Sequence, residues 1–264
     1  MSINVRFYET IARFYDAENA EFNEDLELYS ELAGETGGPV LDVGCGTGRV
    51  MLHLAQEGYR VVGVDNADAM LARGRRKLDV MPDLTSRVTF MHGDALTLDL
   101  PDRFKLIIVP YNSFMHFGEQ RDQLAALRMA ARLLDDDGLL VLDLPNAGDA
   151  YATQDDGTIV LERMFTEPES GHLVMQQSYS MIDRAAQHLY ITWIYDEIAE
   201  EGAVHRTLAP LKLRYVFPGE MDLQLAANGL RRVAFYGDYT REPFEDGSPR
   251  MVVLAGKARG AQAS

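Results

Sequence analysis

Apolar residues between positions 40 and 144 alternate between two kinds of segment. Short apolar runs cover residues 40–43, 59–64, 87–91, 104–109 and 139–144. Segments with apolar residues on one helical face lie among these runs and cover residues 47–57, 68–78 and 120–134. Continuous apolar strands that alternate with amphipathic helices are typical of a parallel sheet covered on both faces. The pattern therefore predicts an α/β fold.

The chain outside this region follows other patterns. Residues 7–33 carry helical spacing, which predicts an N-terminal helical lid. β-branched and aromatic residues alternate partially in four further runs, at residues 159–166, 172–182, 189–198 and 204–217. Short polar gaps between these runs indicate an antiparallel meander.

The α/β pattern returns after the meander. A helix is predicted at residues 219–228, and strands are predicted at 230–236 and 250–257. We therefore expect residues 1–144 and 218–258 to form one domain, with an inserted antiparallel β subdomain at 145–217.

The composition restricts the partners. The 41 acidic residues exceed the 25 basic ones and give a formal net charge of −16. Such a charge repels phosphate backbones and anionic membrane surfaces, so neither nucleic acid nor membrane is expected as a partner. The single cysteine excludes an internal disulfide, and no window approaches the ~20 apolar residues of a membrane span. We expect a soluble, cytoplasmic protein.

A glycine-rich turn follows the first predicted strand. Residues 39–50 read P-V-L-D-V-G-C-G-T-G-R-V, with glycines at positions 44, 46 and 48 and a helix directly behind them. A strand, a tight glycine turn and a helix start together expose bare backbone N–H groups to a ligand. The segment is therefore predicted to hold a nucleotide-type cofactor.

The spacing of this turn discriminates between two cofactors. A dinucleotide site has the pattern G-x-G-x-x-G, whereas the third glycine here arrives one residue early. Asp42 precedes the turn, and a carboxylate there disfavours a pyrophosphate but favours an amine or a sulfonium. Asp65, at the end of the second strand, can accept hydrogen bonds from both ribose hydroxyls of either cofactor. These features favour S-adenosylmethionine over NAD.

Three motifs together resemble those of the class I S-adenosylmethionine-dependent methyltransferases. They are D-V-G-C-G-T-G, V-D-N-A-D-A-M-L and G-D-A, within residues 42–95. The resemblance implies a Rossmann-like, seven-stranded sheet whose last strand is antiparallel. It also implies that Asp42 and the glycine loop hold the methionine end, Asp65 the ribose, and Asn66, Met70, Asp94 and Ala95 the adenine. The cofactor-binding residues expected are Tyr15, Asp42, Gly44, Cys45, Gly46, Asp65, Asn66, Met70, Gly93, Asp94, Ala95 and Val109.

The N-terminal segment Y-E-T-I-A-R-F-Y-D resembles a subgroup that methylates small molecules, including glycine/sarcosine and amino-sugar N-methyltransferases. The resemblance implies that Tyr8 and Tyr15 fold over the cofactor and face the acceptor. The sheet insertion is also similar to that of the subgroup, where it caps the cavity or packs against a second subunit. A small-molecule acceptor is therefore expected, with N-methylation ahead of O-methylation and a homodimer through the insertion.

The acceptor is expected near the end of the fourth strand, because ligands of open α/β sheets bind beyond the carboxyl ends of the strands. That strand runs into V-P-Y-N-S-F-M-H-F. Tyr111 and Asn112 are predicted to orient the nucleophile, and His116 is the candidate base because its ordinary pKa lies near neutrality. The catalytic candidates are His116, Tyr111, Asn112 and Tyr15. The other histidines lack ligand spacing, so no metal site is expected.

Several alternatives stay open from the sequence. His116 is equally well explained as a cap of the following helix, and Arg214 either binds an anion at the cavity mouth or forms a surface ion pair. The whole chain is alternatively an NAD-dependent oxidoreductase or a non-catalytic module that binds S-adenosylmethionine. A protein acceptor is a further alternative, docked by the insertion.

Overall fold

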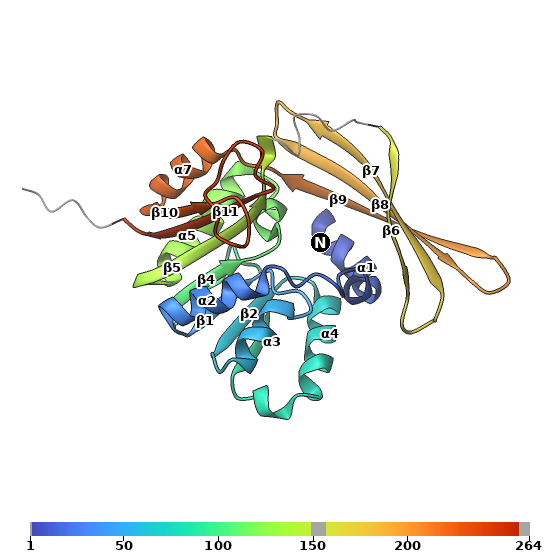
Figure 1. The fold of residues 1–264 in the computed structure, drawn as a ribbon, viewed down its shortest axis with the longest axis horizontal. Helices are drawn as coiled ribbons and strands as arrows, with labels where there is room; N and C mark the ends of the chain where they lie inside the picture. The colour runs from blue at the N-terminus through green and yellow to red at the C-terminus, as the bar shows by residue number, and fades with distance from the viewer. Residues whose placement is uncertain (1, 149–156, 259–264) are drawn as a thin grey trace, which may run out of the picture.

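The structure, a computed structural model, describes residues 2–148 and 157–258, which form two sheets (Figure 1). The larger sheet has the strand order β10–β11–β5–β4–β1–β2–β3. Its strands are β1 (Val40–Val43), β2 (Val61–Asp65), β3 (Val88–His92), β4 (Phe104–Val109), β5 (Leu134–Pro145), β10 (Leu230–Tyr236) and β11 (Arg250–Lys257). β1 pairs in parallel with β2 and β4, whereas β11 is antiparallel to both β5 and β10. The predicted seven-stranded sheet with an antiparallel last strand is confirmed.

Helices cover both faces of this sheet and create a hydrophobic core on each. They are α2 (Leu26–Thr36), α3 (Arg49–Gln56), α4 (Asp68–Asp79), α5 (Gln120–Leu133) and α7 (Pro218–Ala227), with short 3-10 helices η1 (Pro82–Leu84) and η2 (Ser113–His116). Buried residues of α5 and α7 pack against one face, and those of α2 and α3 pack against the other. Continuous burial of β1 and β4 follows from this double cover.

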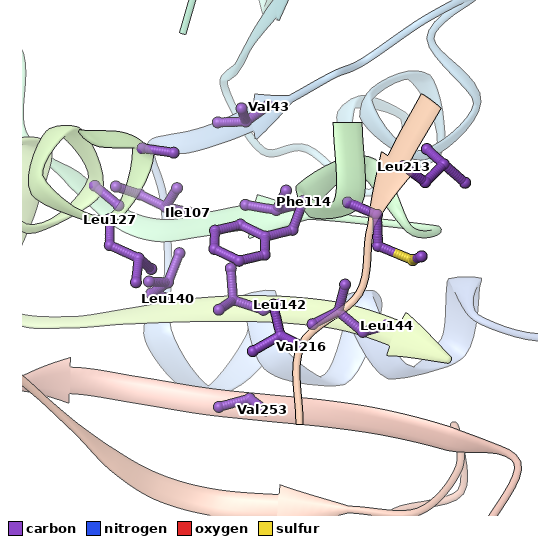
Figure 2. Packing of buried hydrophobic residues seen from close by; sticks show 14 of the residues in the cluster. Val43, Ile107, Phe114, Leu127, Leu140, Leu142, Leu144, Leu213, Val216 and Val253 are labelled. Atoms are coloured by element: carbon purple, nitrogen blue, oxygen red, sulfur yellow. The ribbon is translucent and has the colours of Figure 1, made fainter. Parts of the chain in front are cut away.

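The core on the α5 side fixes the position of η2. Figure 2 shows the ring of Phe114, from η2, beside Leu142 of β5 and close to Val216. Phe114 is 1% exposed, so the short helix is anchored at the end of the larger sheet. This anchor determines where His116, at the end of η2, can lie.

The predicted meander forms a separate four-stranded antiparallel sheet. Its strands are β6 (Ile159–Thr166), β7 (Leu173–Asp183), β8 (His188–Ile198) and β9 (Val204–Arg214), paired in sequence order. Helix α1 (Ile3–Glu18) lies between this sheet and α4 (Figure 1). Arg13 of α1 forms an ion pair with Glu197 of β8 at 2.5 Å, and the ring of Phe14 stacks on Tyr195 at 4.7 Å.

Some predicted boundaries were wrong. The single helical region at 7–33 is two helices, and the predicted helix at 47–57 begins only at Arg49. Strand β5 begins at Leu134, before the strand predicted at 139–144, and contains the three aspartates at 135–137. Leu134 pairs with Phe104, and Lys105 lies 3.3 Å from the Asp135 carboxylate, so this segment extends along β4.

The division into a main domain and an inserted subdomain stays a prediction. Residues 149–156, within the predicted insertion at 145–217, lie outside the described residues. Among the helices at 2–148 and 157–258, none combines the length and apolar character needed to cross a bilayer.

Candidate active site

The glycine turn after β1 has a backbone that side chains would obstruct. Gly44 and Gly48 have φ values of 77° and 85°, in the left-handed region. A Cβ at Gly44 would lie 2.8 Å from the Ser113 hydroxyl, and one at Gly48 would lie 2.7 Å from the Phe90 ring. The turn therefore requires glycine for both conformation and space, and Gly48 directly precedes α3.

Asp65 closes the turn from the end of β2. Its Oδ2 accepts a hydrogen bond from the Gly46 N–H at 2.9 Å, and its Oδ1 accepts one from the Ala67 N–H at 2.9 Å. Each carboxylate oxygen has further acceptor capacity. The carboxylate borders the cavity described below, so it can also accept hydrogen bonds from two ribose hydroxyls.

Asp42 is a buried carboxylate on β1 with an exposure of 1%. Neither oxygen forms a hydrogen bond of normal geometry within the described chain, although the Met51 amide lowers its pKa slightly. Burial raises the pKa of Asp42 to about 7, and the nearby positive charge of Arg49 opposes this. Arg49 is itself bound by both oxygens of Asp25, at 2.5 and 2.6 Å. A cationic ligand would therefore stabilise Asp42.

A cavity of about 250 Å³ joins the glycine turn to α1 and η2. Most of the predicted site residues line it: Tyr15, Asp42, Gly44, Cys45, Gly46, Asp65, Asn66, Met70, Gly93, Asp94, Ala95, Tyr111 and His116. The unpartnered Asp42 carboxylate and the bare backbone of the turn fit the ammonium and carboxylate of a methionine group. These residues can therefore hold S-adenosylmethionine.

Two predicted residues do not line the cavity. Val109 is 4% exposed and packs in the core against α5, because its side chain points to the covered face of the sheet. Asn112 accepts a hydrogen bond from Arg250 at 2.8 Å and lies outside the cavity wall. The strand-end position places neither side chain in the described cavity wall, and their roles at the site stay predictions.

His116 of η2 and Tyr8 of α1 meet in another part of the cavity wall. The Tyr8 hydroxyl lies 3.0 Å from the His116 Nε2, and Nδ1 is buried without a partner in the described chain. Burial lowers the pKa of His116 to about 4, so its ordinary value is the wrong basis for assigning it as a base. The helix α5 begins after Glu119, so His116 is not its N-cap.

Several residues that line the cavity were not predicted from the sequence. They include Ser2, Asn4, Phe117 and Asp122. The side-chain amide of Asn4 donates to the His116 carbonyl at 3.1 Å and to the Lys212 carbonyl at 2.8 Å. No local motif marks these residues, because the cavity brings together segments more than 100 positions apart.

The environment of Arg214 matches neither of the two roles expected from the sequence, an anion site at the cavity mouth or a surface ion pair. Its guanidinium is buried and pairs with Glu220 at 2.7 Å, and it also donates to Gln123 at 2.5 Å. It does not line the cavity, so it neither binds an anion at the mouth nor forms a surface ion pair.

Comparisons with known proteins agree with this geometry. The family model described as "Methyltransferase domain" matches residues 40–138. The cypemycin N-terminal methyltransferase of a Streptomyces species is 28% identical over 256 residues, which cover 93% of this chain and 95% of that protein. A glycine/sarcosine N-methyltransferase of Parasynechococcus marenigrum is 27% identical, with 85% and 74% covered. The solved structure of the CcbJ methyltransferase from Streptomyces caelestis has 26% identity and a TM-score of 0.83, covering 98% of this chain and 100% of that one.

Fold, glycine turn and relatives together define an α/β enzyme that uses S-adenosylmethionine as its cofactor. The chain is an S-adenosylmethionine-dependent methyltransferase that is similar in sequence and fold to the class I enzymes. The alternative of an NAD-dependent oxidoreductase is thereby set aside.

Proposed function

We propose that the protein methylates an amine nitrogen of a small-molecule acceptor that carries no carboxylate. The observation that carries this proposal is the charge of the cavity wall. Asp122, in the first turn of α5, lines the cavity, and Arg49 is the one arginine or lysine among the described lining residues. Because Asp25 already binds Arg49 through both oxygens, no free cation is left there to bind an anionic acceptor.

The relatives support transfer to nitrogen. Two of those compared above are named as N-terminal and glycine/sarcosine N-methyltransferases. A sugar N-methyltransferase from Streptoalloteichus shares the fold at a TM-score of 0.72. When bound, the cofactor would supply a sulfonium methyl group: the amine lone pair would attack the methyl carbon in line, the C–S electron pair would leave with S-adenosylhomocysteine, and the product ammonium would release its proton to solvent. The chain then has to align the amine and exclude water, and a cavity closed by α1 suits that task.

The Tyr8–His116 pair has the position to orient the acceptor. Burial raises the pKa of Tyr8 well above 10, so the phenol keeps its proton. His116 is neutral because its pKa is about 4, and its Nε2 faces the Tyr8 hydroxyl. The pair therefore acts through hydrogen bonds to a nucleophile that arrives as a free amine, and not as a resting base.

A homocysteine-release screen tests the acceptor class. Amines and amino sugars without a carboxylate are expected to be methylated, and glycine and sarcosine are expected to react far more slowly. For an acceptor that carries a second, protonated amino group, Asp122→Asn is expected to raise the KM about 2- to 5-fold, because a partly exposed ion pair contributes little. Asp79→Asn, which removes an exposed carboxylate at the end of α4 that does not line the cavity, is the control. A preference for carboxylated acceptors would contradict the proposal.

The pH profile tests the role of His116. With a pKa of about 4, His116 keeps one protonation state between pH 5.5 and 8. We therefore expect His116→Gln to lower kcat about 10- to 100-fold at every pH in this range without changing the shape of the profile. Loss of an inflection near pH 6.5 in the variant would show instead that His116 titrates as a base.

The homodimer expected through the insertion stays a prediction. The four-stranded sheet exposes large apolar side chains on β6 and β9, including Ile159 and Leu161, and Val204 and Leu208. A second copy packed on this sheet would bury them.

A further inference from the structure

The turn after β4 contains two successive side-chain-bearing residues in a left-handed conformation. Tyr111 has a φ of 45° and Asn112 a φ of 67°. In this region Cβ crowds the carbonyl oxygen, so asparagine is tolerated and tyrosine is disfavoured. Glycine would adopt the same turn freely. The conformation must therefore be held by contacts around it.

Asp143 of β5 receives both backbone donors of this turn. Its Oδ2 accepts a hydrogen bond from the Tyr111 N–H at 3.0 Å, and its carbonyl oxygen accepts one from the Asn112 N–H at 2.9 Å. The Tyr239 hydroxyl also donates to Oδ2, at 3.1 Å. Asp143 has no exposed surface, so these bonds do not compete with water.

Arg250, the first residue of β11, connects Asp143 to Asn112. Its Nε donates to the Asp143 Oδ1 at 3.0 Å, and its Nη2 contacts the same oxygen. The same Nη2 donates to the Asn112 Oδ1 at 2.8 Å. One guanidinium thus binds the buried carboxylate and the side chain of the turn together, which an ammonium group cannot do with the same geometry.

We propose that Asp143 and Arg250 are positioning residues for methyl transfer, which hold the Tyr111–Asn112 turn so that the Tyr111 side chain meets the cavity. Tyr111 lines the cavity, whereas Asp143 and Arg250 are absent from the described part of its wall. The Phe22 ring packs on Tyr111 at 4.4 Å from the other side. This inference rests on the proposed function, because it assigns Tyr111 to the wall beside the acceptor.

The variant Arg250→Lys keeps the positive charge beside Asp143 but loses the hydrogen bond to the Asn112 side chain. With the full chain we expect kcat to fall about 10- to 100-fold, as for a misplaced group near the reacting atoms. The Kd of S-adenosylhomocysteine should change less than about twofold, because the glycine turn that binds the cofactor follows β1 and does not contact Arg250 of β11. Arg214→Lys is the matched control, since its buried pair with Glu220 lies away from the cavity. It should lower Tm without lowering kcat.

Two further readouts separate positioning from general stability. If Arg250 acts through Tyr111, Arg250→Lys should change kcat less than about twofold in a Tyr111→Ala background, whereas independent effects would multiply. Amide hydrogen exchange of a peptide covering residues 109–116 should rise in Arg250→Lys and not in Arg214→Lys. Unchanged exchange, unchanged kcat or multiplicative effects would overturn the inference. If the unaltered protein methylates no amine, the proposed function fails, and the exchange data still judge the turn.

Discussion

Replacing Asp65 with alanine is expected to weaken S-adenosylhomocysteine binding about 100-fold or more while the chain stays folded. Without the carboxylate, the two ribose hydroxyls of the cofactor would lose their hydrogen-bond acceptor. Hydrogen bonds to a charged group contribute about 1.5–3 kcal/mol each. The substitution would also remove the hydrogen bond of 2.9 Å between the Gly46 N–H and the Asp65 Oδ2, so the glycine turn would lose its shape. Calorimetric titration measures the Kd, and circular dichroism checks the fold.

Gly46→Val should produce the same loss for a different reason. Gly46 has a φ of 55°, and a Cβ there would lie 3.3 Å from the Met70 methyl group. A β-branched residue cannot adopt that conformation without strain. Asp68→Ala is the control, because Asp68 lies three residues beyond Asp65 with its side chain 71% exposed. If both Asp65→Ala and Gly46→Val bound S-adenosylhomocysteine with the normal Kd, the glycine turn would not be part of the cofactor site.

Asp42→Asn is expected to stabilise the free protein and at the same time weaken cofactor binding. Burial raises the pKa of Asp42 from 3.8 to about 7, so the folded state holds this proton more tightly than the unfolded state. The free energy of unfolding therefore falls as pH rises from about 4 to 7, and the whole penalty is present above pH 7. Asparagine carries no charge, so the variant should gain about 1–3 kcal/mol at pH 8 and nothing below pH 4.

Cofactor affinity should move in the opposite direction. Loss of one partner of a buried charge pair costs about 2–5 kcal/mol, so the Kd of S-adenosylhomocysteine should rise about 30-fold or more. Chemical denaturation at pH 4 and pH 8 and calorimetric titration at pH 8 measure the two effects. Glu18→Gln is the matched control: burial also raises the pKa of Glu18 to about 7, but this side chain does not line the cavity. An Asp42→Asn variant that binds normally would remove Asp42 from the ligand site.

The half of the site that binds the cofactor could be predicted because it is local in sequence. Asp42, the glycine turn and Asp65 lie within 24 positions, and each follows from a strand end or a tight turn. The fold could be predicted for the same reason, because apolar residues repeat along each strand and each helix with the period of that element. The local sequence pattern did not define the residue at which a strand ends and the following loop begins. Val109 therefore seemed a ligand contact, although β4 directs it into the core.

The other half depends on contacts between distant segments. Tyr8 and His116 are 108 positions apart, and Arg250 reaches Asn112 across 138. His116 is buried where η2 meets β5, β9 and Tyr8 of α1, and no spacing near His116 signals the burial that lowers its pKa. Residue type alone suggested a base and an orienting amide, whereas burial lowers the pKa of His116 and the Asn112 side chain binds Arg250.

Asn4 ties two parts of the molecule together with one side chain. Its amide nitrogen bonds to the backbone of His116 and to that of Lys212 in β9, and its oxygen accepts the Lys212 N–H at 3.1 Å. The four-stranded sheet is therefore mechanically coupled to the helix that carries Tyr8. Because Asn4 belongs to the same helix as Tyr8 and bonds to the His116 backbone, the Tyr8–His116 pair and β9 are positioned relative to one another by a single side chain.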